Sequence, residues 1–194
     1  MNMPLNLPIL LTWLRVALIP IFVGIFYVPD TLLSLPCKNL LGTILFVLAA
    51  VTDWFDGYLA RKWNQTSAFG AFLDPVADKL IVAAALILLS ELDRAPAWLT
   101  FIIIGREITI SALREWMAQL GKSKSVAVNM IGKLKTTAQM IAIGFLLYDM
   151  PLPGLRWIPI PLIGTVALYL AGILTIISMF YYLRVAAQQF KEAA

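Results

Sequence analysis

Six stretches of mostly apolar residues, each close to the length of a membrane-spanning helix, dominate this sequence. They cover about residues 8–28, 40–59, 69–89, 97–117, 129–148 and 160–183. A helix needs about 20 such residues to cross the ~30 Å hydrocarbon core of a bilayer. Hydrophobic residues make up 61% of the chain and charged residues 13%, against about 25% charged residues in soluble domains. The pattern therefore predicts an all-α membrane protein, a six-transmembrane-helix bundle that forms a single domain over residues 1–194.

The segments that connect these stretches differ in charge, and the difference predicts their orientation. Residues 29–38, 90–96 and 149–159 contain more acidic than basic residues: Asp30, Glu91, Asp93 and Asp149 against Lys38, Arg94 and Arg156. Basic residues gather on the cytoplasmic side of membrane proteins, so both termini and the links at 60–70 and 118–128 are expected in the cytoplasm. The net charge of +4 is too small and too dispersed to indicate nucleic-acid binding.

Four aspartates interrupt the apolar pattern at the end of the second stretch and the start of the third. Asp53 and Asp56 are three residues apart, and Asp74 and Asp78 are four apart, so each pair projects from one face of a helix. Carboxylates among apolar residues need a cation, a hydrogen-bonding partner or a proton, and acidic side chains inside a membrane usually mark functional sites. Both pairs lie at the expected cytoplasmic side, where they predict a cytoplasm-facing active-site cleft.

The ligand chemistry of this segment favours a hard divalent cation. Its donors are oxygens, which suit Mg²⁺ or Mn²⁺, and the sequence has no histidine and a single cysteine, Cys37, which we expect in a loop. Divalent ions held by carboxylates can bind a diphosphate and leave one acid to take a proton, as in phosphoryl-transfer sites. The alternative is a set of structural ion pairs with Arg61 and Lys79.

We expect structural roles for two further groups of residues. Thr12 and Arg15 in the first stretch could reach a bound nucleotide or lipid, but we favour Arg15 as an anchor at the cytoplasmic end of a helix. Small residues allow helices to approach closely in membranes, and we expect this of Gly42, Gly144, Gly164 and Gly172.

The acid-rich segment resembles the signature of a known family. Residues 53–78 read D-x-x-D-G-x-x-A-R, then eight residues, then G-x-x-x-D-x-x-x-D. This pattern is similar, without a gap, to the signature of the CDP-alcohol phosphatidyltransferases. The segments NLPILLTWLR, GREITISALREW and GKLKTTAQM resemble the bacterial members that make phosphatidylglycerophosphate, and the resemblance covers essentially the whole chain.

This resemblance implies a reaction, a cofactor and a set of site residues. The reaction transfers the phosphatidyl group of CDP-diacylglycerol to sn-glycerol 3-phosphate and releases CMP, with two divalent ions, in a homodimer in the bacterial plasma (inner) membrane. With no histidine and one cysteine in a loop, we expect direct displacement rather than a covalent intermediate. By position, the resemblance implies Asp53, Asp56, Asp74 and Asp78 as metal ligands, Asp78 also as general base, and Asp53, Asp56, Gly57, Ala60 and Arg61 as CDP-binding residues.

A phosphate-bearing acceptor needs cations that are separate from the metal ions. Arg106, Arg114, Lys133 and Lys135 in the fourth and fifth stretches are the expected glycerol-3-phosphate-binding residues, and Arg106 lies deepest. The two lysines diverge by about 160° on a helix, so we expect one of them to face the cleft. The alternative for these lysines is snorkelling to lipid headgroups.

Other functions fit parts of the pattern. A sister enzyme would use inositol phosphate, serine or phosphatidylglycerol as acceptor. A cation or proton transporter would place its acids near the middle of the bilayer with access from both sides, whereas these acids cluster at one side. A scaffold without chemistry does not explain why acids, glycines and an arginine share one segment.

Overall fold

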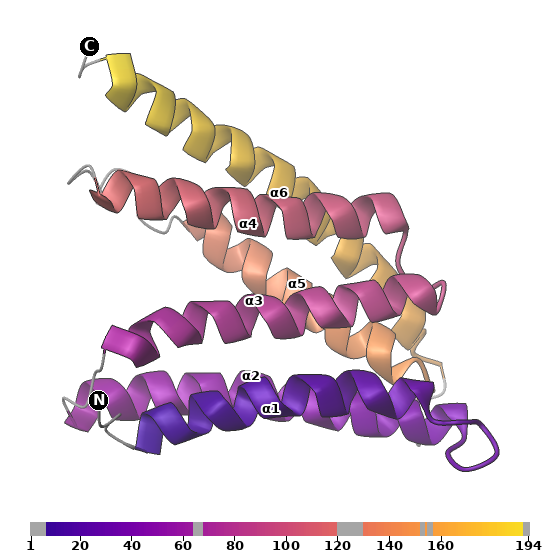
Figure 1. Cartoon of the computed structure of the whole chain (residues 1–194). Helices are drawn as coiled ribbons and strands as arrows, with labels where there is room; N and C mark the ends of the chain where they lie inside the picture. The colour runs from indigo at the N-terminus through magenta and orange to yellow at the C-terminus, as the bar shows by residue number, and fades with distance from the viewer. Residues whose placement is uncertain (1–6, 64–67, 120–129, 152–153, 155–156, 192–194) are drawn as a thin grey trace. The chain divides into compact units, whose positions relative to one another are not determined.

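The structure is a computed structural model that describes residues 7–63, 68–119, 130–151, 154 and 157–191. Within these residues the chain forms six α-helices and no strand (Figure 1). The helices are α1 (Leu7–Tyr27), α2 (Leu35–Trp63), α3 (Ala68–Glu91), α4 (Ala97–Gln119), α5 (Met130–Tyr148) and α6 (Ile160–Lys191). The expected all-α architecture is confirmed, and each apolar stretch lies mostly or wholly within one helix.

Prolines account for several of the helix boundaries. Helix α1 stops shortly before Pro29, and the residue before a proline is disfavoured in helical conformation. Helix α4 follows Pro96, whose carbonyl accepts bonds from the backbone nitrogens of Leu99 and Thr100 at 3.0 and 3.1 Å. Helix α6 follows Pro159, whose carbonyl accepts a bond from the nitrogen of Ile163 at 3.0 Å. A proline at a helix start lacks only a donor that would have no intrahelical partner.

Two of the expected boundaries were wrong. Residues 35–38 belong to α2 rather than to a loop, because the Ser34 carbonyl accepts the nitrogen of Lys38 at 3.0 Å and Pro36 is tolerated in the first helical turn. Cys37 is therefore an exposed residue of a helix, not of a loop. At the other end, α6 runs on to Lys191, beyond the predicted end of the sixth stretch.

The chain divides into two compact units. The first unit comprises residues 1–88 and 147–150, and the second comprises residues 89–146 and 151–194. Helices α1 and α2 with most of α3 belong to the first unit, and α4, α6 and most of α5 belong to the second. The single domain over residues 1–194 stays a prediction.

In the first unit α1 and α2 pack side by side (Figure 1). At one end of this pair Lys38 donates to a carboxylate oxygen of Asp30 at 2.6 Å and to the carbonyl of Phe26 at 3.3 Å. Gly42 lets the helices approach, because a Cβ at this position would lie 2.5 Å from the ring of Phe26. The polar residues toward the other end of this pair, Thr12, Arg15 and Asp53, form part of the candidate site.

In the second unit α4 packs against α6. Gly172 is required there, because a Cβ would lie 2.4 Å from a methyl carbon of Leu99, and Gly164 similarly faces Leu146 at 2.9 Å. Further along, Ile110 and Met117 of α4 meet Tyr182 and Ala186 of α6 in a buried apolar cluster. Close contact is thus confirmed for three of the four expected glycines, whereas Gly144 faces open space.

Helix length and apolar composition identify this chain as a membrane protein. Among the described residues, three segments are long and apolar enough to cross a bilayer: Leu10–Tyr27, Leu35–Asp53 and Ile160–Gln188. Large apolar side chains also point outward, for example Phe101 with 77% of its surface exposed, as a lipid-facing surface requires. Helices α3, α4 and α5 contain further charged residues of the clusters described next, and six crossings stay a prediction.

Candidate active site

In the first unit, aspartates of α2 and α3 meet two polar residues of α1. Asp53 lies in α2, and Asp74 and Asp78 lie in α3. The hydroxyl of Thr12 donates to an oxygen of Asp74 at 2.6 Å. Arg15 lies one turn further along the same face of α1, and its Nη1 donates to oxygens of Asp53 at 2.7 Å and of Asp78 at 2.8 Å. We call these five residues the acid cluster.

Arg15 is the central cation of the acid cluster. Its side chain is fully buried, whereas the side chains of Asp53 and Asp78 are 40% and 47% exposed. The expected anchor role at a helix end was therefore wrong, because a headgroup anchor would keep its charge at the surface. Of the described side chains, Arg15 rather than Lys79 forms the ion pairs with Asp53 and Asp78.

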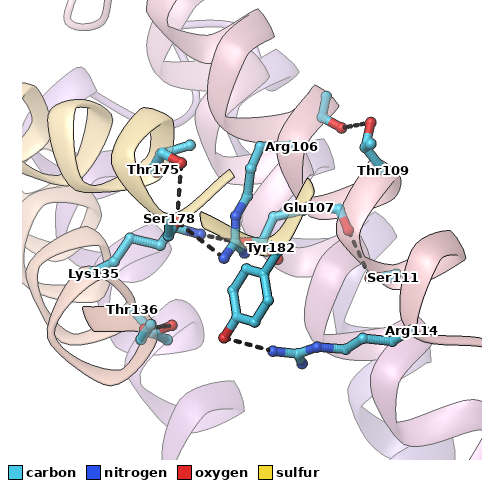
Figure 2. Close-up of polar contacts among 12 residues, drawn as sticks. Arg106, Glu107, Thr109, Ser111, Arg114, Lys135, Thr136, Thr175, Ser178 and Tyr182 are labelled. Atoms are coloured by element: carbon cyan, nitrogen blue, oxygen red, sulfur yellow. Dashed lines mark hydrogen bonds and ion pairs between the residues drawn. The ribbon is translucent and has the colours of Figure 1, made fainter. Parts of the chain in front are cut away.

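The second unit contains a separate basic cluster on α4, α5 and α6 (Figure 2). We define it as Arg106, Glu107, Arg114, Lys135, Ser178 and Tyr182. Arg106 donates to Glu107 at 3.3 Å and to the hydroxyl of Ser178 at 3.2 Å, and Lys135 forms an ion pair with Glu107. Arg106 and Lys135 are buried, with 7% and 1% of their surfaces exposed, so snorkelling to lipid does not describe Lys135.

Arg114 joins this cluster through Tyr182 of α6. Its Nη2 donates to the Tyr182 hydroxyl at 3.2 Å, and its guanidinium carbon lies 5.2 Å from the ring centroid. The guanidinium carbon of Arg106 lies 5.8 Å from the same centroid. Three cations and one carboxylate leave the cluster with two net positive charges, a suitable complement for a phosphate monoester of charge about −1.5 to −2.

Comparison with known proteins identifies the family. The family model for CDP-alcohol phosphatidyltransferase matches residues 5–183. The chain belongs to the CDP-alcohol phosphatidyltransferase family. Among curated relatives, a protein of Pectobacterium atrosepticum is 53% identical over 98% of this chain and 100% of its own length, and one of Sodalis glossinidius is 52% identical over the same shares. A protein of Escherichia coli strain K12 is 50% identical over 95% of this chain and 96% of its own length.

The three relatives carry one name, CDP-diacylglycerol–glycerol-3-phosphate 3-phosphatidyltransferase. The family match covers both the acid cluster and the basic cluster, since it ends only at residue 183. The resemblance inferred from residues 53–78 is therefore confirmed at the level of the family, over nearly the full chain.

Members of this family generally depend on divalent metal ions. Among the side chains that the structure describes, no three acids form a ready cage for an ion. The donor chemistry nevertheless fits, because Asp53, Asp74 and Asp78 offer only oxygens and all contact the same face of α1. The exposed parts of Asp53 and Asp78 leave their oxygens accessible.

Several of the expected site residues lie outside the described side chains. Asp56, Gly57, Ala60 and Arg61 belong to α2, and Lys133 belongs to α5, but the structure describes only their backbone. Their expected contacts with metal, CDP or acceptor stay predictions. Arg106, Arg114 and Lys135 are brought together, as expected of residues that bind one ligand.

Sequence reasoning gave too little weight to two polar residues of the acid cluster and missed two of the basic cluster. Thr12 and Arg15 were considered only as a weaker possibility, and Ser178 and Tyr182 were not considered at all. A signal existed for the first pair, since a threonine and an arginine three residues apart share one face of an otherwise apolar helix. Ser178 and Tyr182 gave no such signal, because serine and tyrosine are common in membrane helices.

Proposed function

We propose that this chain transfers the phosphatidyl group of CDP-diacylglycerol to sn-glycerol 3-phosphate, giving phosphatidylglycerophosphate and CMP. The observation that most directly supports this proposal is the buried basic cluster, whose two net positive charges suit a phosphate on the acceptor. The relatives, about half identical over nearly the full chain, bear a name with the same donor and acceptor.

The acid cluster is the proposed donor site. Asp53, Asp56 and Asp74 would be the principal ligands of two divalent ions, Mg²⁺ or Mn²⁺, with Asp78 near the second. When bound, such ions neutralise the diphosphate and the charge that develops on the leaving CMP. Gly57, Ala60 and Arg61 would contact the CDP portion, the small residues by allowing close approach and the arginine by its fork of donors.

Asp78 is the proposed general base. Its side chain is 47% exposed, so a substrate hydroxyl can approach it, and its Oδ1 accepts the bond from Arg15. The Asp78 carboxylate would accept the proton of the glycerol hydroxyl while that hydroxyl oxygen attacks the lipid-side phosphorus. The bond from phosphorus to the CMP oxygen breaks, and CMP leaves with the electron pair. A single displacement inverts the configuration at phosphorus.

The basic cluster is the proposed site for the acceptor phosphate. Arg106 and Arg114 supply forked donors that match phosphate oxygens, and Lys135 supplies a compact charge. Glu107 holds Arg106 and Lys135 together through two ion pairs. Serine, a zwitterion with no net charge, does not compensate the net charge of this cluster, which favours glycerol 3-phosphate or another phosphate-bearing acceptor.

The remaining proposals concern the membrane. Charge bias among the connecting segments supports both termini and the acid cluster on the cytoplasmic side of the bacterial plasma membrane. There the water-soluble glycerol 3-phosphate is accessible. The likeness to the family supports a homodimer.

An acceptor panel tests this function. Purified protein in detergent is mixed with CDP-diacylglycerol and Mg²⁺, and CMP release is measured with glycerol 3-phosphate, inositol phosphate, serine, phosphatidylglycerol or buffer. We expect fast CMP release only with glycerol 3-phosphate, and phosphatidylglycerophosphate as the lipid product. Fast release with a different acceptor would reassign the reaction, and no release with any acceptor would refute it. A chiral thiophosphate donor that gives retention would exclude direct displacement.

A further inference from the structure

Tyr182 contacts both arginines of the basic cluster. Its ring centroid lies 5.8 Å from the guanidinium carbon of Arg106 and 5.2 Å from that of Arg114. Its hydroxyl accepts a bond from Arg114 Nη2 at 3.2 Å. Figure 2 shows the two arginines approaching the ring at different positions, Arg114 at the hydroxyl end. A single side chain of α6 therefore contacts two cations of α4.

The Tyr182 ring is a rigid support. Only 1% of the residue is exposed, and it packs with Ile110, Met117 and Ala186 in the apolar cluster between α4 and α6. A ring that is this deeply buried among closely packed neighbours keeps one orientation. One turn earlier on the same helix face, Ser178 accepts the bond from Arg106 at 3.2 Å. Helix α6 thus holds both guanidinium groups.

The two arginines need such support if they are to share one anion. They are eight residues apart on α4, which separates their backbones by about 12 Å along the helix axis. Arginine has a long side chain with many rotamers, and ordering it on binding reduces affinity. Contacts that fix both guanidinium groups before the acceptor arrives remove that cost.

We propose that Tyr182 is a positioning residue that aligns Arg106 and Arg114 as a pair of donors to the acceptor phosphate. This inference rests on the proposed function of the basic cluster. The ring restrains both guanidinium groups by cation–π contact, and the hydroxyl sets the direction of Arg114. Tyr182 does not touch the reacting atoms, so its loss weakens acceptor binding without changing the chemical step.

Steady-state kinetics of four variants test this role: Tyr182→Phe, Arg114→Gln, the double variant of these two changes, and Tyr181→Phe. Tyr182→Phe keeps the ring and removes the hydroxyl that accepts the bond from Arg114, and we expect the KM for glycerol 3-phosphate to rise about three- to tenfold. Both kcat and the KM for CDP-diacylglycerol should stay at wild-type values. In an Arg114→Gln background the same Tyr182→Phe change should have no further effect, because the bond it removes is already absent. Tyr181→Phe is the matched control, since Tyr181 is the exposed neighbour and should leave all constants unchanged.

Three outcomes would overturn the proposal. They are an unchanged KM for glycerol 3-phosphate in Tyr182→Phe, an equal rise in KM for both substrates, or a full effect of Tyr182→Phe in the Arg114→Gln background. Thermal unfolding of each variant in detergent reports any loss of packing, and Phe retains the buried ring. A wild-type protein without activity on glycerol 3-phosphate would refute the proposed function itself, which separates that failure from a failure of the role of Tyr182.

Discussion

Replacing Arg15 should make the stability of this protein depend strongly on divalent ions. Arg15 Nη1 bonds to oxygens of Asp53 and Asp78 at 2.7 and 2.8 Å, and the arginine is fully buried. Arg15→Met keeps an unbranched, flexible side chain and removes the cation. The two carboxylates then lose the charge that holds them together, and a divalent ion at the acid cluster no longer competes with the guanidinium group.

The size of the effect follows from the geometry. Two oxygens that bond to one nitrogen lie about 5 Å apart, and at that distance two like charges repel by about 3 kcal/mol at an effective dielectric constant of about 20, or by about 0.8 kcal/mol in water. The carboxylates are 40% and 47% exposed, so solvent screens part of this repulsion. We therefore expect Arg15→Met to lose about 1–3 kcal/mol of stability without divalent ions.

Thermal unfolding in detergent measures this loss. For a chain of this size, about 1–3 kcal/mol corresponds to a decrease in Tm of roughly 2–10 °C in EDTA. Adding Mg²⁺ should raise the Tm of Arg15→Met more than that of the wild type, because a ligand that binds the folded state stabilises it more when its affinity is higher. The difference between the two Mg²⁺-induced increases corresponds to roughly five- to hundredfold tighter binding of Mg²⁺ by Arg15→Met than by the wild type. Arg184→Met, at an exposed arginine of α6, is the control for loss of one positive charge.

The reasoning fails if Arg15→Met is as stable as the wild type in EDTA, since Arg15 would then not balance the acids. It also fails if Mg²⁺ raises the Tm of both proteins equally, since the ion and Arg15 would then not share the same oxygens. The Tm of Arg15→Lys in EDTA should fall between those of Arg15→Met and the wild type, because an ammonium group keeps the charge but not the forked geometry.

Three further predictions concern the base, the acceptor site and the helix contacts. Asp78→Asn should lower kcat at least about 100-fold because the proton acceptor is lost, while equilibrium binding of CDP-diacylglycerol stays near wild type; normal turnover would remove Asp78 as base. Arg106→Ala should raise the KM for glycerol 3-phosphate by about tenfold or more and that for CDP-diacylglycerol little, whereas the exposed Arg184→Ala should change neither; equal rises for both substrates would refute the acceptor role of Arg106. Gly42→Ala should destabilise the protein by about 1–3 kcal/mol because its Cβ meets a phenylalanine ring of α1, whereas Gly144→Ala should be neutral or slightly stabilising; equal Tm values for the two alanine variants would contradict the observed packing.

The sequence alone determined the class of the protein and the aspartates of its acid cluster. Helix formation over long apolar stretches is local, so the number and approximate position of the helices followed from hydrophobicity and proline placement. Helical periodicity likewise places Asp74 and Asp78, four residues apart, on one face of α3. Errors occurred where local signals compete: residues 35–38 look like a loop because of their proline, yet α2 already begins at Leu35.

Only the tertiary structure decided which partners these side chains meet. Arg15 lies 38 and 63 residues from Asp53 and Asp78 in the chain, and nothing local distinguishes a buried counter-ion from a headgroup anchor. Tyr182 lies 68 residues from Arg114, and its role depends on how α6 packs against α4. The pattern of one helix fixes which residues share a face, but the packing of helices fixes what that face contacts.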